Sequence, residues 1–157
     1  GDIVCLLPSF QIKSFGLRGG ETAERTIERI HELDGLALAA HPFMRRGVGA
    51  KICKLDFDGV EIDVRTPKSY LENSGLAVIG SSDAHTRLGV GSSYTLIELS
   101  PSDKGSIMEI IKIIKQRRCL ARVSRNRALL HAIEQARWLK PNYTSRILLS
   151  KLKHLNK

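Results

Sequence analysis

The chain has 157 residues, of which 42% are hydrophobic, and its formal net charge is +9 at pH 7. This length and composition fit a soluble globular domain with its own core, and we find no repeat or low-complexity segment. No apolar run approaches the roughly 18–20 residues of a membrane helix, and no secretory signal opens the chain. The cysteines at positions 5, 53 and 119 are odd in number and widely spaced, which favours reduced thiols. We therefore expect a cytoplasmic protein without membrane contact.

Short apolar runs alternate with helical or loop segments through the first hundred residues. Apolar side chains at three- and four-residue steps from Ala23 to Leu33 predict a helix, which Gly35 is placed to end. Strands are expected at 3–7, 36–40, 59–62 and 76–79. This alternation favours parallel α/β units over a sandwich.

The sequence changes in character near residue 101. Residues 101–157 hold 14 Lys and Arg against 3 Asp and Glu, a net charge of +11, whereas residues 1–100 hold 11 against 13, a net charge of −2. Apolar stripes from Ile107 to Ile114, at 128–136 and at 148–155 predict helices. We therefore expect two units, with a basic helical extension at 101–157.

Two of the expected strands end directly in residues that bind metals. His41 follows the run 36–40, and Asp83 and His85 follow the run 76–79. Ligands in parallel α/β folds gather at the carboxyl ends of strands, and two residues that are two positions apart in an extended segment point the same way. A carboxylate oxygen and imidazole nitrogens can converge there on one divalent cation. The alternative for the Asp-x-His pair is an ordinary turn.

These features resemble the PHP family of metal-dependent phosphoesterases. The resemblance lies in Ala40-His41-Pro42, in Glu61 on the next strand, and in Gly80-Ser81-Ser82-Asp83-Ala84-His85, which is similar to the family's Gly-Ser-Asp-x-His motif. It runs from about Gly1 to Glu98. It implies a distorted (β/α) barrel with two or three divalent metal ions that hydrolyse phosphate esters. The fold class expected here is therefore α/β, a partial distorted barrel of PHP type.

The resemblance also implies roles for single residues. His41, Asp83 and His85 would bind Mn²⁺, Fe²⁺ or Zn²⁺, and Asp83 and His85 would take part in catalysis at the metal, whose bound water becomes acidic. Asp2 would be a further ligand, or else a solvated carboxylate at a strand end. Glu61 would orient a ligand histidine, or would be a simple polar residue at a strand end.

Two loop arginines and a departure from the family complete the candidate site. Arg45 and Arg46 follow the His-Pro-Phe segment, so one of them could clamp the substrate phosphate; the alternative is a solvated loop charge. The family begins with a His-x-His strand, and no such strand precedes Gly1. We therefore expect a carboxyl-terminal half of the domain whose partner is the missing amino-terminal half, and poor hydrolysis by this chain alone.

The function expected first is hydrolysis of a phosphorylated small molecule, a nucleotide or an oligonucleotide. The alternative is a non-catalytic nucleic-acid-binding or interaction module on a degenerate PHP scaffold. Arg117, Arg118 and Arg122 belong to a run of basic residues without acidic neighbours, which suggests binding of RNA or single-stranded DNA through phosphate contacts.

Overall fold

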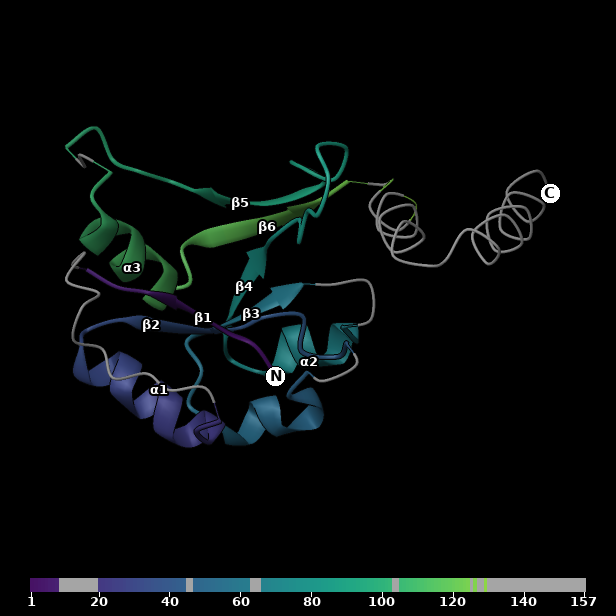
Figure 1. Cartoon of the computed structure of the whole chain (residues 1–157). Helices are drawn as coiled ribbons and strands as arrows, with labels where there is room; N and C mark the ends of the chain where they lie inside the picture. The colour runs from purple at the N-terminus through teal and green to yellow at the C-terminus, as the bar shows by residue number, and fades with distance from the viewer. Residues whose placement is uncertain are drawn as a thin grey trace, which may run out of the picture.

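The computed structural model describes residues 1–8, 20–44, 47–62, 66–102, 105–124, 126 and 129 (Figure 1). Its centre is a four-stranded sheet in the order β1-β2-β3-β4. The strands are β1 (Ile3–Leu6), β2 (Leu36–Ala39), β3 (Gly59–Ile62) and β4 (Ala77–Gly80). Strands were thus correctly predicted at all four places, to within one residue at each end.

The directions of these strands differ in one respect from the prediction. The strands β2, β3 and β4 run parallel, as expected, but β1 runs antiparallel to β2, with Ile3 opposite Ala39. The prediction of a parallel strand at 3–7 was therefore wrong, because an apolar run carries no information about direction. The α/β class is confirmed, and the described strands form open sheets and no closed barrel.

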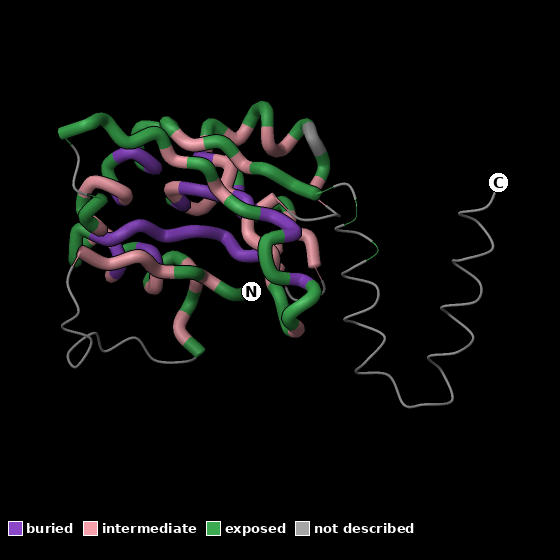
Figure 2. Tube along the Cα trace, turned by 90° about the horizontal axis from the view of Figure 1, so that it is seen from above, coloured by how far each residue is buried: buried purple, intermediate pink, exposed green. Residues whose placement is uncertain are grey.

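Both faces of the central sheet are covered, which explains the continuous apolar runs of its strands. On one face, Ala37 and Ala39 pack with Ile27 and Ile30 of α1 (Ala23–Glu32) and with Ile52 of η2 (Gly49–Lys54). On the other face, Leu36 and Leu38 pack with Ile111 and Ile114 of α3 (Ile107–Lys115). Figure 2 shows the resulting buried stretch through the middle of the molecule.

The helices begin and end at residues suited to those places. Thr22 accepts a hydrogen bond from the Arg25 amide at the start of α1, and Ser106 and Glu109 form a reciprocal capping box at the start of α3. The stripe from Ile107 to Ile114 is therefore confirmed as a helix. A shorter helix, α2 (Lys68–Asn73), lies between β3 and β4. No helix in the described ranges has the length and apolar character needed to span a bilayer.

A two-stranded antiparallel ribbon, β5 (Ser93–Ile97) and β6 (Cys119–Val123), crosses the end of β4. The Gly80 amide donates to Thr95 Oγ1 at 3.0 Å, and that hydroxyl donates to the Gly80 carbonyl at 2.9 Å. A side chain at position 80 would place its Cβ 2.2 Å from the Tyr94 carbonyl oxygen, so only glycine permits this crossing.

The basic segment takes part in this core at its beginning. Helix α3 and strand β6 pack against the central sheet, and β6 was not anticipated from the sequence. The helices expected at 128–136 and 148–155 lie almost wholly outside the described residues, so the division at residue 101 stays a prediction.

Candidate metal site at the carboxyl ends of the strands

The backbone of His41 is held in an uncommon conformation directly after β2. Its φ is +27°, on the left-handed side that non-glycine residues seldom occupy. Its amide donates to Oε2 of the buried Glu61 at 2.7 Å, and its carbonyl accepts from the Met44 amide at 2.9 Å. Strand β3 therefore fixes His41 through its main chain, a contact that the predicted role of Glu61 in orienting a ligand histidine did not specify.

One nitrogen of the His41 ring has a partner, and the other has none among the described residues. Its Nε2 lies 3.3 Å from Oδ2 of Asp2, whose side chain is 78% exposed. Its Nδ1 is buried, and no residue of the described ranges offers it a hydrogen bond. Because buried polar atoms almost always have a partner, an imidazole nitrogen in this state fits the role of a metal ligand.

The second pair lies beyond β4. Asp83 also has a left-handed backbone, with φ +47°. His85 Nδ1 lies 2.8 Å from the Asp83 carbonyl oxygen and 4.0 Å from its carboxylate oxygen Oδ1. A carbonyl oxygen only accepts, so Nδ1 carries the proton and Nε2 is the nitrogen with the lone pair. The turn thus sets the tautomer of His85 as it would be in a ligand.

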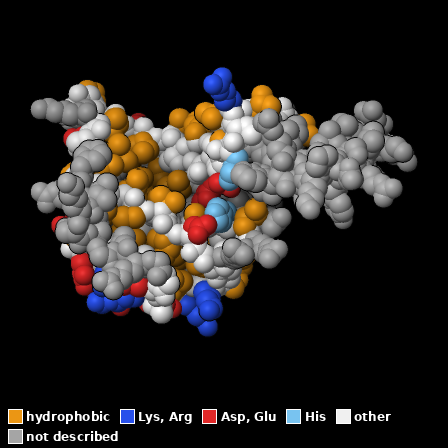
Figure 3. Space-filling view, in the orientation of Figure 1, with side chains coloured by type: hydrophobic (Ala, Val, Ile, Leu, Met, Phe, Trp, Pro, Cys, Tyr) orange, Lys and Arg blue, Asp and Glu red, His pale blue; other side chains and the backbone are white. Residues whose placement is uncertain are grey.

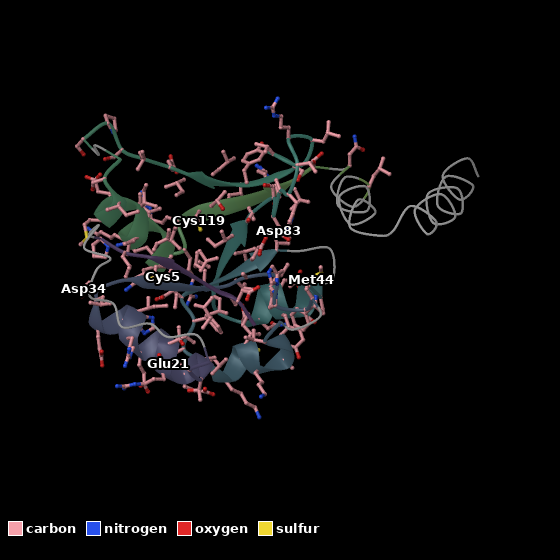
Figure 4. All side chains as sticks on the ribbon, viewed as in Figure 1. Cys5, Glu21, Asp34, Met44, Asp83 and Cys119 are labelled. Atoms are coloured by element: carbon pink, nitrogen blue, oxygen red, sulfur yellow. The ribbon has the colours of Figure 1, made fainter. Side chains whose placement is uncertain are left out.

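These residues lie on one side of the molecule. Figure 4 shows Asp83 on the same side of the sheet as Met44, the residue three positions after His41. Figure 3 shows acidic and histidine side chains gathered on one face, beside a broad hydrophobic area. The strand ends that carry His41, Glu61 and Asp83 are neighbours in the sheet, since β3 lies between β2 and β4.

The carboxylate and imidazole groups at this site are of the kind that bind a divalent ion, but the described residues supply too few of them for a complete site. The structure brings together two pairs, Asp2 with His41 and Asp83 with His85. No group of three or more His, Cys, Asp or Glu side chains that could hold a metal occurs within the described ranges. The predicted ligand set therefore stays a prediction, and Arg45 and Arg46 lie outside the described residues.

A different histidine has the more complete hydrogen bonding. His31 on α1, which looks like a surface residue in the sequence, has its Nε2 2.9 Å from Oδ2 of Asp58 and its Nδ1 3.6 Å from Asp56. The same Asp58 oxygen accepts from the Ala37 amide at 2.7 Å. The signal in the sequence was an aspartate immediately before β3. This cluster lies at the amino ends of β2 and β3, away from the candidate site.

The fold and the strand-end residues define an α/β protein with a polar site at the carboxyl ends of parallel strands. Residues 63–119 match a family model described as PHP-associated, which confirms the resemblance to the PHP family. This match is consistent with a PHP carboxyl-terminal region, and the matched stretch includes Asp83 and His85 but neither Asp2 nor His41.

One relative of known sequence is also similar. It is the uncharacterized protein MJ1587 of Methanocaldococcus jannaschii, which is 47% identical over 45 residues. The aligned part is 27% of this chain and 26% of that protein, so the chain spans about a quarter of the relative that it matches. No solved structure matches.

Proposed function

We propose that this chain is part of a metal-dependent phosphoesterase of the PHP type. The observation that carries the proposal is the left-handed backbone of both His41 and Asp83 at the carboxyl ends of parallel strands. Such conformations cost free energy and concentrate at functional sites. The PHP-associated match over residues 63–119 supports the same assignment.

The protein's own residues would each have a defined task. His41, Asp83, His85 and Asp2 would hold Mn²⁺, Fe²⁺ or Zn²⁺ together with ligands from outside the described residues. Bound divalent ions polarise a phosphoryl oxygen and lower the pKa of a coordinated water. Glu61 positions His41 through its amide, and the Asp83 carbonyl fixes the tautomer of His85. Arg45 or Arg46 would clamp the phosphate of a nucleotide, an oligonucleotide or a small metabolite.

The test is metal content and turnover in the full-length protein. We expect Asp83→Asn and His41→Ala to lower bound metal by at least half, and to lower phosphoesterase activity by about 10²-fold or more, because the loss of a metal ligand, or of a group that orients one, has effects of this order. Asp56→Ala is the matched control, since this carboxylate is 94% exposed and lies at the other end of the sheet. Metal and turnover that stay at wild-type levels in Asp83→Asn would remove this residue from the site.

We expect slow hydrolysis of phosphate esters by this chain alone. A two-metal centre takes more ligands than the two pairs that the described residues bring together. Addition of the amino-terminal part of the domain should therefore raise Mn²⁺-dependent hydrolysis of a test phosphodiester. High turnover by the 157 residues alone, abolished in Asp83→Asn, would contradict this expectation.

The second candidate function is that of a non-catalytic module that binds nucleic acid. The exposed Arg122 lies opposite the half-exposed Tyr94 on the β5–β6 ribbon, so one aromatic ring and one guanidinium face solvent together. The test is a titration with single-stranded DNA at several salt concentrations. The slope of log affinity against log salt concentration should become less steep by about 2 when Arg117, Arg118 and Arg122 are all replaced by Ala. An unchanged slope would exclude these arginines from contact with phosphate.

A further inference from the structure

A shallow surface cavity of about 530 Å³, widely open to solvent, lies at the end of the β5–β6 ribbon where β5 ends and β6 begins. None of the described residues of the candidate metal site lines this cavity, so it is separate from the strand-end site. Arg117 and Arg118 line it together with the aliphatic Leu96 and Leu120. Its volume is within the range of sites that bind small molecules, roughly 300–1,000 Å³.

The two arginines have no acidic partner within the described ranges. Neither guanidinium lies within 4.0 Å of a described carboxylate, although Glu98 lines the same cavity; the hydrogen bond of Arg118 is a long one, 3.5 Å, to the Gln116 side-chain oxygen. Leu96 and Leu120 face each other across the ribbon and are 46% and 49% exposed. The cavity thus has two arginine residues and an aliphatic wall in its lining.

The backbone of Arg117 adds an independent observation. Helix α3 ends with the Arg117 amide donating to the Ile114 carbonyl at 2.8 Å and the Arg118 amide donating to the Ile113 carbonyl at 3.0 Å. This pattern places a left-handed residue at the position of Arg117, where φ is +58° and glycine is the usual choice. An arginine there gives up stability that glycine would supply, which is a cost associated with functional positions.

We propose that this cavity binds an organic anion that carries one phosphate or carboxylate group on an apolar body. The oxyanion would accept charge-assisted hydrogen bonds from Arg117 and Arg118, which suit planar, two-pronged contacts. The apolar body would cover Leu96 and Leu120. The carboxylate of Glu98 would repel a second anionic group elsewhere on the ligand, so the cavity favours ligands with a single phosphate or carboxylate group.

The experiment follows the backbone amides of the full chain by NMR during titration with phenyl phosphate, phenylacetate and inorganic phosphate. We expect saturable shifts at residues 96–98 and 117–120, and tighter binding of the phenyl compounds than of inorganic phosphate. The tighter of the two phenyl compounds identifies the anionic group. Absence of saturable shifts at these residues, or equal affinity for inorganic phosphate, would overturn the proposal.

Two variants make the test specific. Arg117→Gly should weaken binding of the preferred phenyl compound about tenfold, while raising the thermal midpoint of the free protein by about 2–4 °C, because glycine accepts the left-handed conformation. Arg118→Gln should weaken binding without that rise. Lys115→Ala is the matched control, since this exposed lysine removes the same charge but does not line the cavity. Equal weakening in Lys115→Ala would show general charge attraction and overturn the proposal.

Discussion

Histidine and aspartate meet at both ends of the central sheet, with opposite consequences for the fold. At the amino ends of the strands, one Asp58 oxygen joins His31 to the Ala37 amide, and neither His31 nor Asp58 has a positive φ. At the carboxyl ends, His41 and Asp83 both have positive φ, and Nδ1 of His41 lacks a described partner. The same residue types thus stabilise the fold at one end and cost stability at the other.

The largest expected effect tests the amino end. Asp58→Ala should lower the free energy of unfolding by about 2–4 kcal/mol, because it leaves the buried Ala37 amide without its acceptor and removes the partner of His31. Urea denaturation measures this loss. Asp56→Ala, which removes a 94% exposed carboxylate near the same histidine, should change stability by less than about 0.5 kcal/mol. Equal effects of the two variants would mean that Asp58 does not hold this end together.

The next effect has the opposite sign and tests the carboxyl end. Asp83→Gly should raise the free energy of unfolding by about 0.5–1 kcal/mol, since glycine adopts φ +47° without the steric cost borne by a side chain. Asp34→Gly, at the left-handed residue that ends α1, is the matched control and should stabilise by a similar amount. Only Asp83→Gly should also lower metal content. A clear loss of stability in Asp83→Gly would make Asp83 a structural residue like Asp58.

The smallest effect extends the comparison from the ends of the sheet to its two faces. Burial raises the pKa of Cys5, beside the α1 face, and of Cys119, beside the α3 face. Both thiols should therefore react with iodoacetamide more slowly than the exposed Cys53. Their contribution to stability is present below the ordinary thiol pKa and is lost as the pH rises above about 9, because the unfolded chain releases these protons first.

Mass spectrometry of the alkylated chain gives the three rates in one experiment. If Cys53 reacts fastest and Cys5 and Cys119 react at similar, slower rates, both faces of the sheet are covered to a similar degree. If Cys119 reacted as fast as Cys53, β6 would pack against the central sheet less tightly than the partial burial of Cys119 indicates.

Apolar runs and their polar ends were enough to predict much of this molecule. The strand at 59–62 and the helix that begins at Ile107 were placed correctly, because the spacing of apolar residues in the sequence predicts elements of this kind. Strand β6 was not anticipated, because its residues alternate between half-buried and exposed and include Arg122 within a basic run. The antiparallel direction of β1 depends on long-range pairing, which no local pattern records.

The candidate site could also be predicted only in part, because some of its features are local and others depend on contacts between distant strands. The positions of His41 and Asp83 at strand ends follow from the local sequence. Their left-handed backbones, and the hydrogen bond from the His41 amide to Glu61, depend on β3 lying between β2 and β4. A carboxylate that holds a main-chain amide twenty positions away leaves no signature in composition or periodicity.

The order of the strands also has a consequence for how the chain reaches this structure. Within the described part of the chain, a helix or a 3-10 turn separates the partners of every strand pair, as α1 separates β1 from β2 and α3 separates β5 from β6. No tight hairpin can therefore form early and guide the rest, and each pairing must first close a long loop. Mixed α/β topologies of this kind fold more slowly than helical bundles of similar length. We expect the helices to form well before the sheet, so that the apolar strands are transiently exposed during refolding and favour association at high protein concentration.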